Sequence, residues 1–185
     1  MLRLTCGSLK GKTIECPPGK DIRPTSSKTR QGIFNVLFSM GFNIEGAKVL
    51  ELFAGTGLIS FESISRGAVF SVMVDKSSSS LDVIKRNVQK LNLVGKIKLI
   101  KNDAEDFLNT EDIEAFDLIY LDPPYNYDGY VRIISIMASK MSKDTILIAE
   151  SDNEFLKGNI EGLELIKIKK WGKSFAHFMR RINAG

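Results

Sequence analysis

Short apolar runs alternate with amphipathic segments through the middle of the chain. Each run has the length and character of a buried strand, and we predict five such strands. The predicted strands cover residues 47–53, 69–75, 96–103, 116–122 and 145–151. Segments with helical spacing, several of them opened by glycines or serines, separate these runs, and residues 130–141 read as one such helix. This alternation predicts an α/β fold with a mostly parallel sheet and helices on both faces.

The two ends of the chain depart from this alternation. Residues 1–22 predict a small hairpin followed by a loop rich in proline and glycine. Residues 29–40 place apolar side chains at helical spacing, with Thr29 as the candidate N-cap. Near the C-terminus, two strand-like runs flank Gly172-Lys173 and predict an antiparallel hairpin.

Length and composition fit one domain with a well-buried core. The chain has 185 residues, of which 43% are hydrophobic and 26% are charged, values that are ordinary for a globular protein. We therefore expect a single domain over residues 1–185, divided into a basic N-terminal extension (1–45) and a core (46–185).

Nothing in the sequence predicts export, a membrane span or a metal site. No apolar run approaches the roughly 20 residues of a membrane helix, and the N-terminus lacks the apolar centre of a signal peptide. Cys6 and Cys16 form neither a metal nor a disulfide pattern, so we expect reduced thiols and a cytoplasmic protein. The single histidine, His177, cannot form a metal site alone, and we expect it to have a structural or surface role.

The net charge of +4 conceals an asymmetry along the chain. Residues 1–48 carry eight basic and three acidic side chains, and residues 157–185 carry seven and two. The middle, residues 49–156, carries eleven basic and seventeen acidic side chains. Basic flanks around an acidic centre favour an anionic macromolecule, such as a nucleic acid, held by the two ends. Solvated surface lysines would account for the same counts.

The carboxyl ends of the predicted strands are the places where a parallel sheet binds ligands. The first strand runs into "ELFAGTG", where Gly55 and Gly57 lack a Cβ and allow a ligand to approach backbone amides. The third glycine of a dinucleotide fingerprint would fall at Ser60 and is missing. Glu51, just before the turn, disfavours a pyrophosphate and favours a cationic or amine-bearing ligand.

Polar residues also end the second and third predicted strands. Asp75 lies about 20 residues after the glycine turn, where a carboxylate typically accepts hydrogen bonds from ribose hydroxyls. Asn102-Asp103-Ala104 ends the third strand, and an acid there can accept from an exocyclic amine, although an N-cap for residues 104–108 is an equally natural role. A nucleoside with a positively charged amino-acid tail, such as S-adenosylmethionine, would suit this set of groups.

The fourth predicted strand ends in Asp122-Pro123-Pro124-Tyr125, "DPPY". Two prolines cannot donate to a sheet ladder or continue a helix, so the chain must turn at the end of a buried strand. The motif therefore exposes a carboxylate, a turn rich in carbonyl groups and an aromatic ring at one place.

Together, "VLELFAGTG", the Asp75 strand end, "NDA" and DPPY resemble the class I S-adenosylmethionine-dependent methyltransferases that modify exocyclic amines. Within them, "RPTSSKTRQGIFNVL" and "ELFAGTGLISFESISRGA" resemble the bacterial guanine-N2 methyltransferases of small-subunit (16S) ribosomal RNA. The resemblance covers essentially the whole chain. It implies a Rossmann-like class I methyltransferase fold, with a mostly parallel seven-stranded sheet and a C-terminal antiparallel hairpin. The implied substrate is 16S ribosomal RNA or the small ribosomal subunit.

The resemblance also implies roles for individual residues. The Asp122 carboxylate and the Pro123 carbonyl would accept hydrogen bonds from the two N–H groups of the target amine, and Tyr125 would stack on the extruded base. The predicted catalytic residues are Asp122, Pro123, Pro124 and Tyr125. The predicted cofactor-binding residues are Arg23, Pro24, Thr25, Glu51, Phe53, Ala54, Gly55, Thr56, Gly57, Asp75, Lys76, Asn102, Asp103 and Ala104.

Basic residues towards both ends are candidates for RNA contacts. Arg23, Lys28 and Arg30 are predicted to hold phosphates or to fold over the cofactor. Lys173, in the predicted C-terminal hairpin, is a further RNA-binding candidate. The same hairpin carries Lys169, Lys170, Arg180 and Arg181. A solvated hairpin face is an equally good interpretation of these last positions.

Three other functions are weighed against this one. The DPPY motif also serves adenine-N6 methyltransferases that act on DNA or another RNA, although those enzymes usually carry an additional target-recognition region and this chain is short for one. A non-catalytic RNA-binding module would not need carboxylates at several strand ends. A nicotinamide-dependent oxidoreductase would need the missing third glycine. We expect no membrane partner, and nothing in the chain requires a second subunit.

Overall fold

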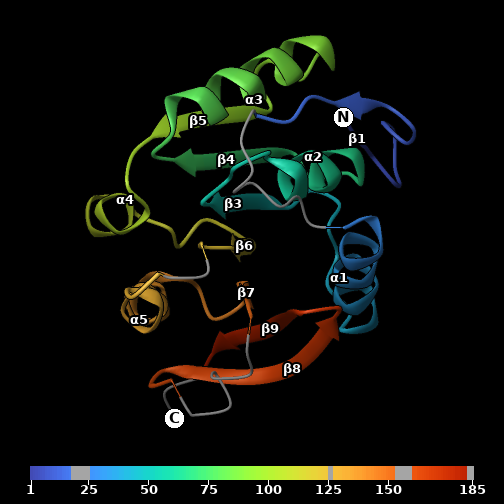
Figure 1. Cartoon of the computed structure of the whole chain (residues 1–185). Helices are drawn as coiled ribbons and strands as arrows, with labels where there is room; N and C mark the ends of the chain where they lie inside the picture. Colours follow the sequence, from blue (N-terminus) through green and yellow to red (C-terminus); the bar gives the residue numbers. More distant parts are fainter. Residues whose placement is uncertain (18–25, 125–126, 153–159, 183–185) are drawn as a thin grey trace.

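The computed structural model describes residues 1–17, 26–124, 127–152 and 160–182. Helices and strands alternate through most of this chain (Figure 1). In chain order the elements are β1 (Leu2–Arg3), β2 (Thr13–Ile14), α1 (Ser27–Ser39), β3 (Lys48–Leu52), α2 (Leu58–Ser65), β4 (Phe70–Asp75), α3 (Ser78–Lys90), β5 (Ile97–Lys101), α4 (Ala104–Thr110), β6 (Leu118–Leu121), α5 (Tyr130–Lys140), β7 (Ile146–Ser151), β8 (Leu163–Trp171) and β9 (Ser174–Arg181). Within the described ranges, no helix is long and apolar enough to cross a membrane.

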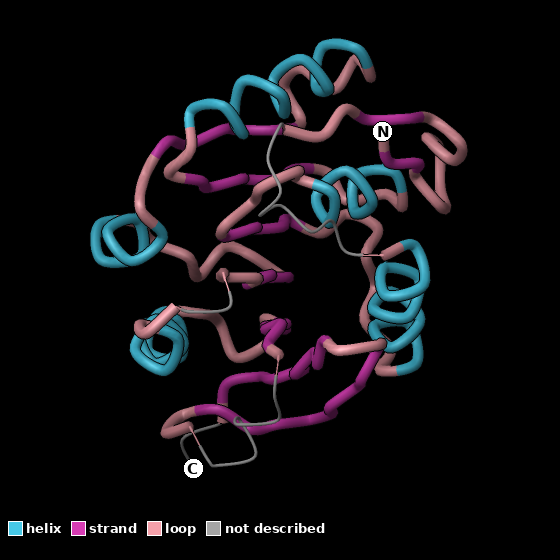
Figure 2. Tube along the Cα trace, in the orientation of Figure 1, coloured by secondary structure: helices cyan, strands magenta, loops and turns pink. Residues whose placement is uncertain are grey.

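One seven-stranded sheet organises the molecule, and Figure 2 shows its strands in magenta. The strand order is β5-β4-β3-β6-β7-β9-β8, with the strands labelled in Figure 1. The strands β3 to β7 run parallel, whereas β9 pairs antiparallel with both β7 and β8. The predicted parallel sheet and C-terminal hairpin are therefore confirmed. The strand order reverses between β3 and β6, and in open parallel sheets ligands bind outside the carboxyl ends of the strands at such a reversal.

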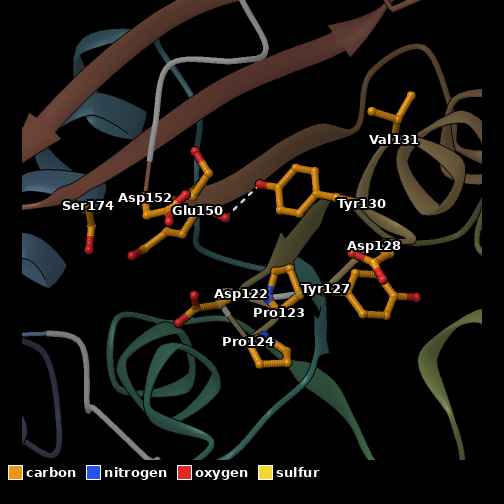
Figure 3. A pocket seen from close by; sticks show the side chains of 11 residues that line it. Asp122, Pro123, Pro124, Tyr127, Asp128, Tyr130, Val131, Glu150, Asp152 and Ser174 are labelled. Carbon is orange, nitrogen blue, oxygen red and sulfur yellow. Dashed lines mark hydrogen bonds between the residues drawn. The ribbon is translucent and has the colours of Figure 1, made fainter.

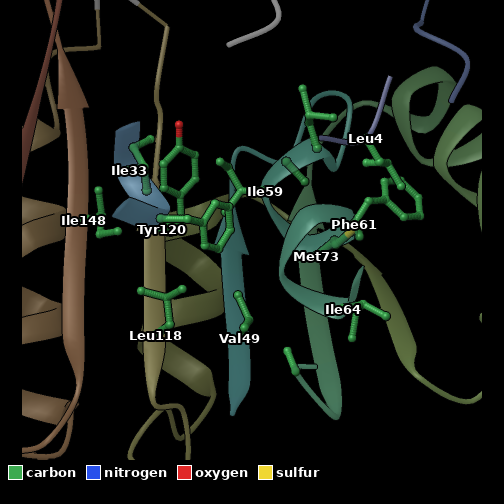
Figure 4. Packing of buried hydrophobic residues seen from close by; sticks show 14 of the residues in the cluster. Leu4, Ile33, Val49, Ile59, Phe61, Ile64, Met73, Leu118, Tyr120 and Ile148 are labelled. Atoms are coloured by element: carbon green, nitrogen blue, oxygen red, sulfur yellow. The ribbon is translucent and has the colours of Figure 1, made fainter. Parts of the chain in front are cut away.

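Two apolar layers cover the sheet. Helices α1, α2 and α3 pack on one face through a cluster that includes Ile33, Phe61 and Ile84. Figure 4 shows part of this cluster, with Ile33 and Phe61 labelled. Helices α4 and α5 pack on the other face, where Phe107 and Ile133 are buried. Central strands are apolar on both sides because helices cover both faces, and this explains the continuous apolar runs of the sequence.

The N-terminal extension packs into the first of these clusters. The strands β1 and β2 form a two-stranded antiparallel pair, as predicted for the start of the chain. Leu4 and Ile14 are buried against α2 and its neighbours. Helix α1 begins at Ser27, two residues before the predicted range of 29–40, because the Ser26 hydroxyl accepts from the Thr29 backbone N–H and caps the helix. Thr29 is therefore not the N-cap, as we had predicted, but lies buried in the first turn.

Helix α1 also contacts the C-terminal hairpin. At Gly32 an added Cβ would lie only 2.4 Å from Cζ2 of the Trp171 indole ring. The helix and the end of β8 can approach this closely only because Gly32 has no side chain. In the hairpin, His177 is fully buried, with Nδ1 3.2 Å from the Ala149 carbonyl, which fits its predicted structural role. Cys6 and Cys16 are both free, as predicted.

Candidate active site

The parallel strands β3 to β7 end along one edge of the sheet, and the predicted site residues follow them there. The turn after β3 carries three residues with positive φ, which are Phe53 at 55°, Gly55 at 52° and Gly57 at 68°. A Cβ on Gly57 would lie 2.8 Å from the Met73 sulfur, so this glycine is required for packing. A Cβ on Gly55 would meet only the Phe53 carbonyl, at 3.8 Å, so Gly55 borders open space where a ligand can reach the backbone.

Phe53 joins this turn to the loop after β6. A non-glycine residue with positive φ is strained, and such residues concentrate at functional sites. The Phe53 ring packs edge-on against the Tyr127 ring, with 5.0 Å between the ring centroids. The glycine turn and the segment that follows Pro124 are therefore in direct contact.

Asp75 holds the glycine turn in place. Its carboxylate accepts from the Gly55 backbone N–H at 2.7 Å and from the Ser77 N–H at 2.8 Å. Ser77, rather than Asp75, is the N-cap of α3, as the run of serines predicted. Each carboxylate oxygen has two lone pairs, so Asp75 retains the capacity to accept from ligand hydroxyls.

The strand end after β5 has a local structural role as well. Asp103 is the N-cap of α4 and accepts from the Glu105 N–H at 2.9 Å, and Asn102 Oδ1 accepts from the Asp103 N–H. The N-cap alternative that the sequence left open is therefore realised. One Asp103 oxygen makes that cap, and the half-buried carboxylate remains at the sheet edge beside the buried Ala104.

Glu51 lies beneath the start of α2 and is only 3% exposed. Its carboxylate accepts from the Ser60 N–H at 2.8 Å, close to the positive end of the helix dipole. Burial raises the pKa of Glu51 to about 7, although the hydrogen bond from Ser60 acts in the opposite direction. Glu51 stabilises the start of α2 after the glycine turn through its bond from Ser60. Its contact with a ligand stays a prediction. Ala54 and Thr56 are likewise buried, whereas Lys76 is exposed.

A cavity of about 310 Å³ opens beside Asp122 at the ends of β6 and β7 (Figure 3). Burial, followed by the nearby carboxylates of Glu150 and Glu51, raises the pKa of Asp122 well above its usual range. Tyr125 lies outside the described residues, so its predicted stacking stays a prediction. The cavity is lined by Asp122, Pro123, Pro124, Tyr127, Asp128, Tyr130, Val131, Glu150, Ser151, Asp152 and Ser174.

Sequence reasoning missed Glu150. It lies near the end of β7, is 5% exposed, and accepts from the Tyr120 hydroxyl at 2.5 Å. Its backbone carbonyl accepts from the Tyr130 hydroxyl at 2.6 Å, the bond drawn in Figure 3. The rule that identified Asp75 and Asp122, an acid ending a buried strand, would have found Glu150 if it had been applied to the fifth predicted strand.

The predicted RNA-binding residues have different surroundings. Lys28, in the first turn of α1, and Lys173, in the turn between β8 and β9, are exposed. Arg30 is 1% exposed, and its guanidinium donates to Glu62 at 3.4 Å and to the Arg3 carbonyl at 2.9 Å. The prediction of a phosphate contact for Arg30 is therefore wrong, because its charge is already neutralised inside the protein. Arg23, Pro24 and Thr25 lie outside the described residues.

The family model described as "Conserved hypothetical protein 95" matches residues 2–180. A Bacillus subtilis (strain 168) protein named "Putative rRNA methyltransferase YlbH" is 31% identical over 157 residues, which cover 83% of this chain and 84% of that protein. "Ribosomal RNA small subunit methyltransferase D" of Buchnera aphidicola subsp. Acyrthosiphon pisum is 27% identical over 150 residues, with 80% and 76% covered. The solved structure of "Putative methyltransferase yhhF from Escherichia coli" superposes with a TM-score of 0.85 at 21% identity and covers 97% of each chain, so the folds are alike.

Proposed function

We propose that this chain, which belongs to the family described as Conserved hypothetical protein 95, transfers a methyl group from S-adenosylmethionine to the N2 amine of a guanine in small-subunit (16S) ribosomal RNA. The match over residues 2–180 and the named relatives confirm the predicted family resemblance. The relatives' names concern ribosomal RNA methylation, and the choice of N2 of guanine is our inference from the sequence resemblance to the guanine-N2 methyltransferases. The observation that carries the proposal is the cavity beside Asp122, next to the glycine turn.

The residues at the ends of β3, β4 and β5 fit S-adenosylmethionine. Gly55 borders open space, so the cofactor can lie against the backbone of the turn. Asp75, fixed by two backbone N–H groups, retains lone pairs that would accept from ribose hydroxyls, and the second oxygen of Asp103 would accept from the adenine amine. When bound, S-adenosylmethionine supplies a methyl group on a sulfonium, and its sulfur keeps the electron pair of the broken carbon–sulfur bond.

Asp122 and Pro123 prepare the amine for this transfer. The lone pair of an exocyclic amine is delocalised into the base, so the nitrogen is a poor nucleophile. Two acceptors, the Asp122 carboxylate and the Pro123 carbonyl, would hold its N–H groups and turn its lone pair towards the methyl group. The prolines fix the backbone that presents the carbonyl. Alignment of the reacting atoms can contribute on the order of 7–11 kcal/mol to lowering the barrier.

One proton must leave the nitrogen after the new N–C bond forms. The methylated amine is strongly acidic at that point, so no finely tuned base is required. Asp122, already hydrogen-bonded to the amine, is placed to receive the proton, and its raised pKa favours that transfer. Solvent then takes the proton from the half-buried carboxylate.

Exposed basic residues towards both ends of the chain are proposed to bind the phosphates of RNA. Lys28 and Lys173 are far apart in sequence and both exposed. Phosphate contacts of this kind give affinity that falls steeply with salt and carries no sequence choice. Among the other basic positions of the hairpin, Arg180 pairs with Glu164 and Arg181 donates to the Met141 carbonyl. These two arginines are thus partly engaged within the protein.

The test is methyl transfer to defined substrates. The purified protein is incubated with S-adenosylmethionine carrying a labelled methyl group and, in parallel, with small ribosomal subunits, free ribosomal RNA or duplex DNA from cells lacking the enzyme. We expect label in the ribosomal samples, recovered as N2-methylguanosine after digestion. Label found only in DNA as N6-methyladenine would overturn the proposal.

Replacing Asp122 provides the matched test of mechanism. We expect Asp122→Ala to lower kcat at least about 100-fold, the order of loss for removing one polar group that stabilises a transition state, while cofactor affinity is retained. Asp144→Ala, which removes an exposed aspartate before β7, serves as the control and should retain full activity. If the two variants were equally active, Asp122 would have no role in the reaction.

A further inference from the structure

Glu150 and Asp122 are neighbours on adjacent parallel strands. The register pairs Leu121 of β6 with Ala149 of β7, so the next pair along both strands is Asp122 and Glu150. Side chains alternate along a strand, so Asp122 lies on the face of Tyr120 and Glu150 on the face of Ile148. Tyr120 and Ile148 belong to one apolar cluster on the same face of the sheet. Both residues line the cavity proposed for the target base. Asp122 and Glu150 therefore place two adjacent carboxylates in the cavity, which Asp128 and Asp152 also line.

The Glu150 carboxylate is held in a fixed position. The buried Tyr120 hydroxyl donates to its Oε1, and the Tyr130 hydroxyl fixes the backbone carbonyl of the same residue. The bond from Tyr120 uses only one of about four acceptor sites on the carboxylate. The remaining acceptor sites of Glu150 are available to a ligand in the cavity.

The surroundings of Asp122 and Glu150 favour a ligand edge that only donates hydrogen bonds. Within the described ranges, no salt bridge joins Asp122 or Glu150 to a cation. A guanine presents neighbouring donors, N1–H and the N2 amine, along one edge. Adenine and cytosine place an acceptor nitrogen beside the amine, and that lone pair would face a carboxylate. Two adjacent carboxylates therefore match the edge of guanine and oppose those of the other amine-bearing bases.

We propose that Glu150 selects guanine by accepting a hydrogen bond from N1–H while Asp122 accepts one from the N2 amine. Tyr120 is then a positioning residue, because it acts on the base only through Glu150. This inference rests on the proposed function, since it assigns a second contact to the same base. A site built to accept from an N–H rejects analogues that lack it, because its own polar group is then left without a partner.

The test uses a base analogue that keeps the N2 amine but lacks N1–H. Once the methylated nucleotide has been mapped, ribosomal RNA is assembled with either guanine or 2-aminopurine at that position. 2-Aminopurine retains the N2 amine but has a lone pair in place of N1–H, and it also lacks the O6 carbonyl, so the Glu150→Gln variant is needed to assign the preference to N1–H. We expect the wild-type protein to favour guanine at least 30-fold in kcat/KM. A wild-type protein that methylates both bases equally well would overturn the inference without any variant.

Glu150→Gln provides the second arm. The glutamine oxygen can still accept from Tyr120, and its NH2 group then faces the base, where it suits the N1 lone pair of 2-aminopurine and opposes N1–H of guanine. We expect the guanine preference to fall at least tenfold, with cofactor affinity unchanged. Glu114→Gln, at an exposed position before β6, is the matched control and should keep the wild-type preference. A purely structural Glu150 would alter total activity but not this ratio.

The variants and the two RNAs separate the possible failures. If wild-type protein adds no methyl group to N2 of any guanine in ribosomal RNA, the proposed function itself is wrong. If it does, and Glu150→Gln keeps the wild-type preference, only the role of Glu150 is wrong. Should Glu150→Gln fail to fold, Tyr120→Phe leaves the carboxylate in place but unanchored, and we expect it to lower the preference about threefold. An unchanged preference in that variant would also contradict the inference.

Discussion

Glu62 on α2 and Glu150 on β7 are both buried glutamates, with exposures of 0% and 5%, but their neighbours differ completely. Glu62 forms ion pairs with Arg30 and Arg66 and accepts from the Thr5 backbone and hydroxyl at 2.8 and 2.9 Å. Glu150 accepts from a neutral tyrosine and lies beside another carboxylate.

This difference distinguishes Glu62, which has a structural role, from Glu150, which is suited to bind a ligand. Glu62 has partners for both oxygens, so its charge is neutralised and nothing is left for a ligand. It connects three segments that are distant in sequence, namely the β1–β2 extension, α1 and α2. Burial raises the pKa of Glu150, and the pKa of Tyr130 is also raised by burial and by the acids Asp122 and Glu150. Groups with pKa values shifted in this way concentrate at ligand-binding and catalytic sites.

The largest loss of stability should come from breaking the buried ion pair between Arg30 and Glu62. Glu62→Ala leaves the Arg30 guanidinium buried without its carboxylate, which costs about 3–5 kcal/mol of unfolding free energy. Urea unfolding measures this loss directly. The control is Glu164→Ala, which breaks an exposed pair with Arg180 and should cost less than about 1 kcal/mol. Equal losses in the two variants would mean that Glu62 is not the structural acid that the comparison requires.

A smaller effect is expected from Glu51, an uncompensated acid that should make stability depend on pH. Its pKa is about 7 in the folded protein and about 4.5 ordinarily, so the folded state binds the extra proton between those values. Stability from this group is therefore present below about pH 4.5 and is lost as the pH rises to about 7. At pH 8, Glu51→Gln should be more stable than the wild type by up to about 3 kcal/mol.

The difference in unfolding free energy between Glu51→Gln and the wild type, measured by urea unfolding from pH 4 to pH 8, isolates this group from Asp122 and Glu150. Glutamine keeps an oxygen that can accept from the Ser60 N–H, so the local hydrogen bond survives. A difference that does not change over this range would show that Glu51 stays ionised when buried, contrary to the direction of its pKa shift.

The smallest effect should come from Asp75, whose carboxylate is held by backbone amides. Asp75→Asn keeps one acceptor oxygen for the turn but loses the charge that favours ribose hydroxyls. We expect affinity for S-adenosylmethionine to fall about tenfold, or about 1.4 kcal/mol, in isothermal titration calorimetry. Asp106→Asn, exposed on α4, is the control. If both variants bound the cofactor equally well, Asp75 would serve the turn alone.

Much of the fold could be read from the sequence because the strand signals are local. The runs ending at Asp75 and Asp122 are apolar and short, and the strands formed within a few residues of the predicted bounds. The cap of α1 was misplaced because Ser26 and Thr29 both carry a hydroxyl within one turn. Only the three-dimensional path of the chain decides which hydroxyl accepts from a helix N–H.

The error at Arg30 has a different cause from the omission of Glu150. Arg30 follows two other basic residues, and nothing nearby in the sequence shows that Glu62, on another helix, neutralises it. Burial of a long cationic side chain depends on contacts between distant elements, which no local pattern contains. Glu150, by contrast, obeyed the same local rule as Asp75, so its position could have been predicted from the sequence.

The close contact between Gly32 and Trp171 has a consequence for biosynthesis. Helix α1 is translated well before the strand that carries Trp171. Until then, the apolar side of α1 has no hairpin to cover it, although α2 and β3 are already available. A nascent chain arrested before β8 should therefore expose α1 to chaperones and proteases, and protection of this helix should arrive only after β8 has been translated.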